Sequence, residues 1–167
     1  MNKIILKGEK KYLIIKKEVN HILKELNELN IKILNTNIDE LELLRYNANG
    51  IKKEVTSTYY KKQIEEGKMI AFSCFYNNEL VGGAYISNSL QSLFIELIFV
   101  KKEMQNNKLH IGSYLLNYIL KNKEIIEEYF GVKFNISRLD NKEHESFYKK
   151  IGYVNENNIL DTMKKRI

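Results

Sequence analysis

Apolar residues recur at two different spacings at the start of the chain. Short β-prone runs at residues 2–6 and 12–16, on either side of Gly8, predict a hairpin or a pair of strands. Beyond them apolar residues return every three or four positions, which predicts a helix carrying Val19, Ile22, Leu23, Leu26 and Leu29. We expect this extension, residues 1–30, to pack on the core. The same stripe could instead cover a substrate groove or form a dimer contact.

Residues 31–66 predict one strand followed by two helices. The run IKILNTN (31–37) has the composition of a strand, and Asn37 with Glu40 three positions later is typical of a helix N-terminus. The first helix ends at an Asn-Gly pair and carries apolar residues at helical spacing: Ile38, Leu41, Leu44 and Ala48. The second helix covers about residues 57–66 and stops at a glycine.

From residue 69 onward the pattern changes to strands. Residues 69–76, 79–87 and 93–100 are apolar runs separated by short polar turns, which predicts a three-stranded antiparallel meander. A helix that begins at Ile111 has one apolar stripe, which must pack on the sheet: Ile111, Tyr114, Leu115, Tyr118 and Ile119.

The last part of the chain predicts a strand that runs parallel to its neighbour. Residues 132–139 form this strand, and because a helix precedes it, a parallel pairing is favoured. A helix over residues 141–151 and one or two closing strands complete the chain. The fold class is therefore α+β, with a mixed, mostly antiparallel sheet.

Length and composition favour a single domain. The chain has 167 residues, 44% of them hydrophobic and none of them proline, which is enough for one core. Lysines interrupt the apolar runs near the start, so we expect neither a secretion signal nor a membrane span, and hence a cytoplasmic protein. The formal charge of +6 comes from lysines spread along the whole chain, so it does not favour a nucleic-acid partner.

Cysteine and histidine usage indicates neither a disulfide nor a metal site. Cys74 is the only cysteine, and no cysteine or histidine cluster has metal-ligand spacing. Cys74 lies in an apolar strand run without a suitably spaced histidine, so we expect a buried thiol rather than a nucleophile.

Glu96 is the most informative single residue. It is the only charge in the run LFIELIFV (93–100), and strand alternation places it on the same face as Phe94, Ile98 and Val100. A carboxylate inside a sheet core is costly unless it has a partner or a chemical task. Glu96 is therefore a candidate general base. The alternative is that it lies at an edge, where it reaches water or a lysine.

The loop KKEMQNNKLH (101–110) and the helix start that follows it form a candidate phosphate site. The N–H groups in the first turn of a helix have no internal acceptor and lie at the positive end of the helix dipole. Gly112 and Ser113 are small enough to let phosphates approach. Many strand-loop-helix units share these features and bind nothing, so an ordinary surface loop remains open.

A third candidate segment is NKEHESFYKKIGY (141–153). Helical spacing places Asn141, His144 and Tyr148 on one face, and a phenol there can donate a proton to a leaving group. The alternative is that Phe147 and Tyr148 only anchor the helix to the core.

Together these segments resemble the GNAT superfamily of acetyl-CoA-dependent N-acetyltransferases. In that family a strand ending in an aromatic-Val pair precedes a [QR]xxGx[GA] pyrophosphate loop and its helix, and a later NxxxxxFYxxxGF segment lies beside the cofactor. The corresponding runs here are IELIFVKKEMQNNKLHIGSYLL and NKEHESFYKKIGY, and the likeness covers about residues 31–165. It implies one domain over residues 31–167, with helices on both faces of the sheet and two central strands splayed into a V.

The resemblance implies a cofactor-binding loop with unusual residues. Asn107 stands at the Gln/Arg position, His110 at the first glycine and Gly112 at the second small position, so two of three anchor residues depart. Besides Asn107, backbone N–H groups would hold the pyrophosphate, and these do not depend on the identity of the side chains. They belong to Lys108, Leu109, His110, Ile111, Gly112 and Ser113. The departure matters most at His110, because glycine accepts a positive φ more readily. His110 could contact phosphate itself, or the loop could bind more weakly.

The resemblance also implies chemical roles for five residues. Backbone groups of Phe99 and Val100 would bind the pantetheine arm and the thioester carbonyl, and Asn141 would contact the pantetheine. Glu96 would take the proton of the attacking amine. Tyr148 would protonate the CoA thiolate.

The implied activity is transfer of an acetyl group from acetyl-CoA to a primary amine of a small molecule, peptide or protein, by direct attack in a ternary complex. The protein would act as a monomer or homodimer, without a metal or a membrane partner. One alternative is a catalytically weak or inactive acyl-CoA-binding or regulatory module. Another is a toxin that acetylates aminoacyl-tRNA. The helix pair at about 38–66 is expected to select the acceptor.

Overall fold

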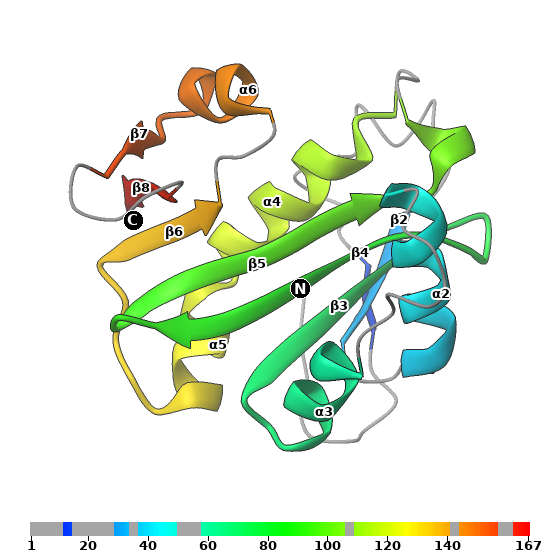
Figure 1. Ribbon diagram of the computed structural model, residues 1–167, viewed down its shortest axis with the longest axis horizontal. Coiled ribbons are helices and arrows are strands. Elements are labelled where there is room, and N and C mark those ends of the chain that lie inside the picture. Colours follow the sequence, from blue (N-terminus) through cyan, green and yellow to red (C-terminus); the bar gives the residue numbers. More distant parts are fainter. Residues whose placement is uncertain are drawn as a thin grey trace.

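The chain forms a long mixed sheet with helices on both faces (Figure 1). The computed structural model describes residues 12–14, 29–33, 37–49, 58–105, 109–140, 144–156 and 162–167. Within this part, eight strands follow the order β1-β2-β3-β4-β5-β6-β8-β7. All neighbours pair antiparallel except β5 and β6, which are parallel. The predicted α+β class and mostly antiparallel sheet are confirmed.

The described strands and helices have the following bounds. The strands are β1 (Tyr12–Ile14), β2 (Leu29–Ile33), β3 (Met69–Tyr76), β4 (Glu79–Ser89), β5 (Ser92–Val100), β6 (Ile136–Asp140), β7 (Val154–Asn155) and β8 (Thr162–Arg166). The helices are α2 (Ile38–Asn49), α3 (Tyr59–Glu65), α4 (Ile111–Lys121), α5 (Lys123–Phe130) and α6 (Glu145–Lys150), with a 3-10 turn, η2 (Lys102–Met104).

The N-terminal extension contributes one strand to the edge of the sheet. β1 pairs antiparallel with β2, so part of the run predicted at 12–16 is a strand. The run at 2–6 and most of the helix predicted from Val19 lie outside the described residues. Leu29 was expected on that helix, but it begins β2. Its side chain is buried because odd-numbered positions of β2 face the core.

Local signals set the ends of the middle elements as expected. The Asn37 side chain accepts a hydrogen bond of 2.9 Å from the N–H of Asp39, which satisfies a free donor at the start of α2. Asn77 and Asn78 both adopt positive φ, as a tight hairpin between β3 and β4 requires. The meander β3-β4-β5 is confirmed by the register of both pairs.

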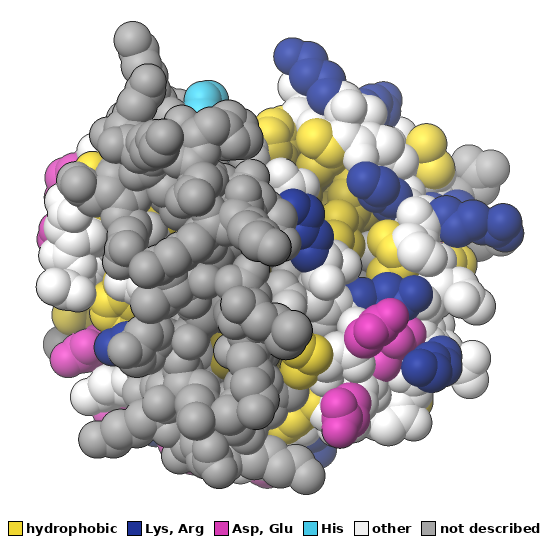
Figure 2. Space-filling view, turned by 180° about the vertical axis from the view of Figure 1, so that it is seen from behind, with side chains coloured by type: hydrophobic (Ala, Val, Ile, Leu, Met, Phe, Trp, Pro, Cys, Tyr) yellow, Lys and Arg dark blue, Asp and Glu magenta, His cyan; other side chains and the backbone are white. Residues whose placement is uncertain are grey.

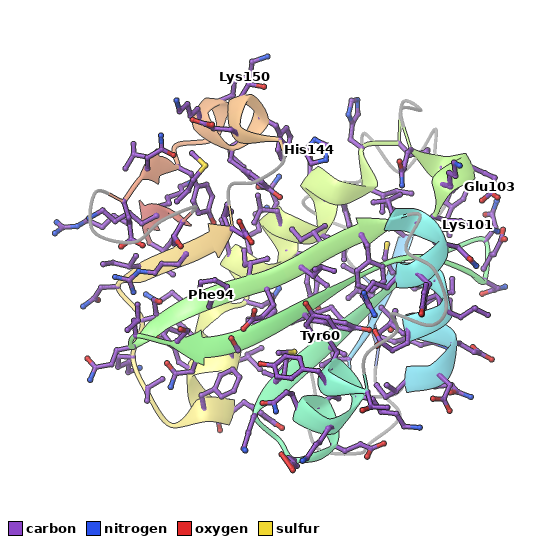
Figure 3. All side chains as sticks on the ribbon, in the orientation of Figure 1. Tyr60, Phe94, Lys101, Glu103, His144 and Lys150 are labelled. Carbon is purple, nitrogen blue, oxygen red and sulfur yellow. The ribbon has the colours of Figure 1, made fainter. Side chains whose placement is uncertain are left out.

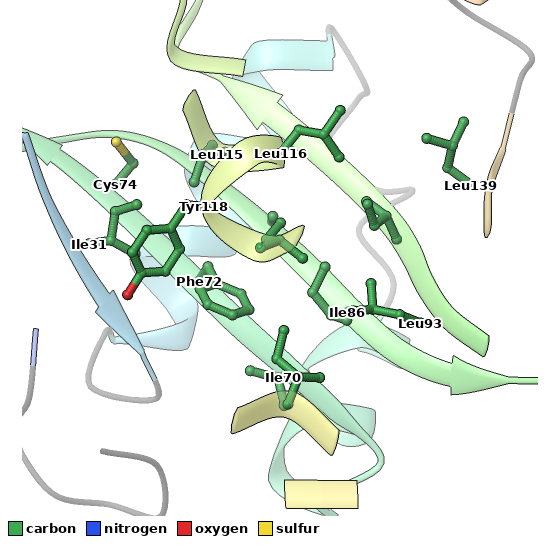
Figure 4. Packing of buried hydrophobic residues seen from close by; sticks show 14 of the residues in the cluster. Ile31, Ile70, Phe72, Cys74, Ile86, Leu93, Leu115, Leu116, Tyr118 and Leu139 are labelled. Carbon is green, nitrogen blue, oxygen red and sulfur yellow. The ribbon is translucent and has the colours of Figure 1, made fainter. Parts of the chain in front are cut away.

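Two hydrophobic clusters sandwich the sheet. The larger lies between the sheet and α4, where Tyr118 contacts Phe72 edge to face with ring centroids 5.9 Å apart (Figure 4). Most of the predicted α4 stripe is buried there: Ile111, Leu115, Tyr118 and Ile119. The smaller cluster lies under α2 and α3 and includes Leu41, Ile64, Tyr85 and Phe99. The expectation of helices on both faces is therefore confirmed.

The two central strands separate soon after they meet. β5 and β6 pair only from Leu93 with Ser137 to Ile95 with Leu139. Beyond this point β5 continues to Val100, whereas β6 ends at Asp140, and the two strands diverge (Figure 1). The expected V is present, and its open side faces the beginning of α4 (Figure 1).

The reverse face of the molecule carries many basic side chains. In Figure 2 most of the lysine and arginine side chains lie in the right-hand half of the view, among hydrophobic and acidic ones. Exposed basic residues occur on α6 and β8: Lys149, Lys150, Lys164 and Arg166. Among the described helices, none combines the length and the apolar character needed to cross a membrane.

Gly83 allows α2 to lie close to the sheet, and its replacement should destabilise the fold. A Cβ at this position would lie 2.7 Å from Leu41 Cδ1, 2.7 Å from Phe99 Cζ and 3.0 Å from the Phe72 carbonyl oxygen. We expect Gly83→Ala to lower the free energy of unfolding by about 1–3 kcal/mol in urea denaturation. Gly112→Ala is the control, because among the described residues only Val100 Cγ2, at 4.0 Å, is near its Cβ. Equal stability of both variants would contradict this packing.

Candidate active site

Glu96 occupies a β-bulge at the point where β5 leaves β6. Tyr85 pairs with Leu97 and Ile86 pairs with Ile95, so Glu96 has no partner in β4. The extra residue resets the side-chain alternation. The expectation that Glu96 shares a face with Ile98 and Val100 is therefore wrong. Those two pack toward the larger cluster under α4, whereas Glu96 faces a pocket beside α3.

The Glu96 carboxylate is half-buried and has a defined partner. Ser87 Oγ donates a 2.6 Å hydrogen bond to Glu96 Oε1. Both residues line a pocket of about 410 Å³, whose polar lining residues are Gln63, Lys68, Ser87, Asn88, Ser89 and Glu96. Tyr59 and Phe130 contribute aromatic walls. The carboxylate is thus neither in the apolar core nor simply in solvent, and it can contact a molecule in this pocket.

The open half of β5 presents backbone groups toward the V. The N–H of Lys101 donates to the carbonyl of Val81 at 2.7 Å, which shows that odd-numbered residues here exchange hydrogen bonds with β4. The backbone groups of Ile98 and Val100 therefore point away from β4, toward the side that β6 has left. Those of Phe99 point toward β4. The backbone groups of Val100 therefore face the V, as the resemblance implies. Those of Ile98 face it as well, whereas those of Phe99 do not.

Gln105 covers part of this open edge. Its Nε2 donates a 2.8 Å hydrogen bond to the carbonyl of Val100 and a 3.4 Å one to the carbonyl of Ala48. The side chain therefore links the end of β5 to the C-terminal part of α2.

The start of α4 has the conformation that the resemblance requires. His110 is exposed and adopts φ 53° and ψ 45°, the left-handed conformation, directly before the helix. The first intrahelical bond runs from the Tyr114 N–H to the His110 carbonyl, so the N–H groups of residues 111–113 precede it. Ile111 is buried, while Gly112 and Ser113 are half-buried and Leu109 packs on the core. Asn107 and Lys108 lie outside the described residues.

The segment after β6 differs from the expected continuous helix. α6 begins at Glu145, and His144 before it adopts φ 60°, so a helical face shared by His144 and Tyr148 is wrong. A left-handed residue turns the chain at the helix start. Figure 3 labels His144, which lies directly before α6 and is exposed. Asn141 lies outside the described residues.

Tyr148 is half-buried on α6 and contacts other aromatic rings. Its ring centroid lies 5.4 Å from that of Phe147 and 6.0 Å from that of Tyr153. Phe147 and Tyr148 both pack against the larger cluster, as the anchoring alternative expects. The role of Tyr148 as an acid stays a prediction.

A buried charged network lies on the face of the sheet that α2 and α3 cover. Glu42 and Arg45 of α2 are 7% and 5% exposed. Glu42 Oε2 accepts hydrogen bonds from Arg45 Nε at 2.7 Å and from the Tyr85 hydroxyl at 2.6 Å. Burial, reinforced by the Glu42 carboxylate, raises the pKa of Tyr85, so the phenol stays protonated and donates. The network joins α2 to β4 directly opposite the bulge.

Tyr60 extends this network toward Glu96. The Arg45 guanidinium lies 4.9 Å from the Tyr60 ring centroid, and the Tyr60 and Tyr85 rings are 5.1 Å apart (Figure 3). Burial raises the pKa of Tyr60, the Arg45 charge opposes the rise and the Glu96 carboxylate adds to it. Tyr60 therefore lies within electrostatic reach of both charged groups. Arg45 fixes α3, the helix that supplies Tyr59 and Gln63 to the pocket.

Cys74 is a buried thiol of the larger cluster. Burial raises its pKa to about 12, so the thiolate is not available near neutral pH.

Several residues of this site carried no clear signal in the sequence. Ser87 and Lys68 are polar residues at strand ends, which is ordinary. Glu42 and Arg45 lie three positions apart on a helix, a spacing that usually marks an exposed pair. Only their burial under Tyr60 and Tyr85 distinguishes them.

Comparison with protein families agrees with this geometry. The family model described as an acetyltransferase (GNAT) domain matches residues 42–161, well over half of the chain. The protein therefore belongs to the GNAT acetyltransferase family. A comparison with curated protein sequences gave no match.

Solved structures share the fold at low sequence identity. The PaiA N-acetyltransferase from Thermoplasma acidophilum, in complex with coenzyme A, is 19% identical, with 82% of this chain and 99% of that chain covered and a TM-score of 0.58. A GNAT family acetyltransferase from Elizabethkingia anophelis, with acetyl-CoA bound, is 20% identical, with 82% and 98% covered and a TM-score of 0.53. AtaTR bound with AcCoA is 16% identical, with 83% and 92% covered and a TM-score of 0.61.

Replacing His110 tests whether its imidazole or its backbone conformation serves the loop. A left-handed histidine is strained relative to glycine by about 1 kcal/mol. We expect His110→Gly to leave the affinity for coenzyme A unchanged or increase it, as measured by isothermal titration calorimetry. His110→Ala keeps the strain and removes the imidazole, so it is the matched control. A large loss of affinity in both variants would instead make the imidazole a ligand.

Removing one partner of the buried network should destabilise the protein more than removing both. Arg45→Met leaves the Glu42 carboxylate buried without its ion pair, and we expect a loss of about 3–5 kcal/mol in the free energy of unfolding. The double variant Glu42→Leu with Arg45→Met should lose less, because no buried charge remains. Lys61→Met, which breaks the exposed pair with Asp39, should have little effect. A double variant at least as unstable as the single one would contradict this account.

Proposed function

We propose that this protein transfers an acetyl group from acetyl-CoA to a primary amine by direct attack in a ternary complex. The observation that carries this proposal is the position of Glu96. It is the first residue of β5 beyond the last pair with β6, and its side chain faces the pocket beside α3. A base at this point can serve an amine in the pocket, while the open edge of β5 remains available to the other substrate.

The open side of the V fits acetyl-CoA. The backbone groups of Ile98 and Val100 can bind an extended amide-containing arm as a neighbouring strand would. The first-turn N–H groups of α4 can hold a pyrophosphate, and the nearest atom to a Cβ at Gly112 is 4.0 Å away, so this turn is open to a ligand. Asn107, Lys108 and Asn141 are assigned to the same site by the resemblance alone.

The reaction then requires two proton transfers by side chains of the protein. Acetyl-CoA supplies an activated thioester. Glu96 accepts the proton of the attacking amine, directly or through water, as the new N–C bond forms. The Ser87 hydroxyl keeps one carboxylate oxygen in place. Tyr148 donates a proton to the sulfur as the C–S bond breaks. The products are an N-acetylated amine and coenzyme A.

One alternative function, an acyl-CoA-binding or regulatory module, is supported by the unusual loop. His110 stands where the family has glycine, and its left-handed conformation is strained. In such a module coenzyme A would bind without turnover on any amine, and Glu96 would have no role.

Glu96→Gln separates the two functions. We expect kcat/KM, followed by thiol release from acetyl-CoA with a panel of primary amines, to fall by about 10²–10⁴-fold, because the amide cannot accept the proton. The affinity for coenzyme A should not change, since Glu96 faces the other side of the sheet. Glu124→Gln on the exposed face of α5 is the matched control and should retain full activity. Turnover unaffected by Glu96→Gln would refute the role of this residue, and binding without any turnover would favour the module.

A further inference from the structure

The pocket beside Glu96 contains one charge of each sign. Glu96 is the only carboxylate among its described lining residues, and Lys68 is the only cation. Glu96 lies on β5 at the bulge, while Lys68 lies between α3 and β3, so the two charges come from different walls. A ligand that carries an amine at one end and a negative charge at the other would match both.

The other polar groups of the pocket favour an acceptor with oxygen atoms. Gln63 and Asn88 can each donate through an amide NH₂, and Ser89 can donate through its hydroxyl. Carboxylate and phosphate oxygens accept such hydrogen bonds, and a charged acceptor makes them stronger. Ser87 differs from this group, because its hydroxyl already donates to Glu96.

The present partner of Lys68 does not prevent this role. Lys68 Nζ lies 3.3 Å from Glu66 Oε2, and the two side chains are 65% and 38% exposed. Exposed ion pairs of this kind contribute little to stability, so an anionic ligand can replace Glu66 at little cost. Lys68 follows Gly67, which is in a left-handed turn at the end of α3, and it therefore lies at the rim of the pocket.

The size of the pocket favours a small molecule. A volume of about 410 Å³ is near the lower end of the range for small-ligand sites. Glu96 and two residues of α3, Tyr59 and Gln63, line it, and Tyr60 of the same helix contacts Arg45. The pocket is open to solvent on one side, so it suits a small amine that enters from the surface.

We propose that the acceptor is a small primary amine that carries an anionic group, either a carboxylate or a phosphate ester, with its amine at Glu96 and its anionic group at Lys68. This inference rests on the proposed acetyl transfer and names the substrate class of the same site. The amine nitrogen loses one proton to Glu96 and gains the acetyl carbon, and the anionic group does not react.

Matched pairs of amines test the proposal on the full-length protein. We would compare 4-aminobutyrate with butylamine, and phosphoethanolamine with ethanolamine, by thiol release from acetyl-CoA at constant ionic strength. The wild type should prefer the anionic member of a pair by about tenfold in kcat/KM, the size of one charged hydrogen bond. In Lys68→Met the preference should fall to about twofold. Lys62→Met, an exposed lysine on α3 outside the pocket lining, should keep the full preference.

Each possible result supports or overturns a distinct claim. Preference for the anionic member of at least one pair, lost in Lys68→Met and kept in Lys62→Met, supports the inference. Turnover of amines without that preference, or a preference that survives Lys68→Met, overturns the inference and leaves acetyl transfer intact. Turnover of a lysine peptide or an aminoacyl-tRNA about a hundredfold above every small amine overturns the small-molecule class. Absence of turnover with all amines overturns the proposed function and this inference together.

Discussion

β5 pairs with two neighbouring strands over different lengths. β4 pairs with it along its whole length, whereas β6 pairs with only three of its residues and then departs. The bulge at Glu96 lies directly after Ile95, the last residue of β5 that pairs with β6. It turns one carboxylate toward the α3 face while the next residues continue the ladder with β4. The bulge thus directs Glu96 to the pocket beside α3, while the strand edge beside α4 is open because β6 stops pairing at Ile95.

The region opposite the bulge is held by polar contacts rather than by apolar packing alone. Glu42, Arg45 and Tyr85 are buried, and their hydrogen bonds tie α2 to β4 next to the pairing shift. A buried ion pair gives little net stability compared with an apolar replacement, but its geometry is specific. Arg45 also contacts Tyr60 of α3, so the helix that supplies Tyr59 and Gln63 to the pocket beside Glu96 is contacted by a residue that does not line the pocket.

Sequence patterns predicted most of the fold, because β3 and β5 are apolar runs buried on both faces of the sheet and α4 has a single buried stripe. They failed at Glu96, where alternation assumes an uninterrupted strand and cannot anticipate a bulge. They also failed at Leu29 and His144, where the burial of β2 and a left-handed residue before α6 override local propensity. The family motif identified His110 as a position where glycine is usual, and its left-handed conformation shows why. The Glu42 and Arg45 pair could not be foreseen, since its burial depends on partners 15 and 43 positions away, Tyr60 in α3 and Tyr85 in β4.

The half of β5 that β6 leaves uncovered is an interior strand edge. Edges of this kind invite pairing with any extended chain, and here Gln105 already occupies the Val100 carbonyl. A ligand bound in this way is recognised by main-chain atoms, which every amino-acid sequence supplies equally. Side chains along the edge can therefore change freely while the binding geometry persists. Backbone recognition along this edge would therefore tolerate the low sequence identity, 16–20%, at which other solved structures share this fold.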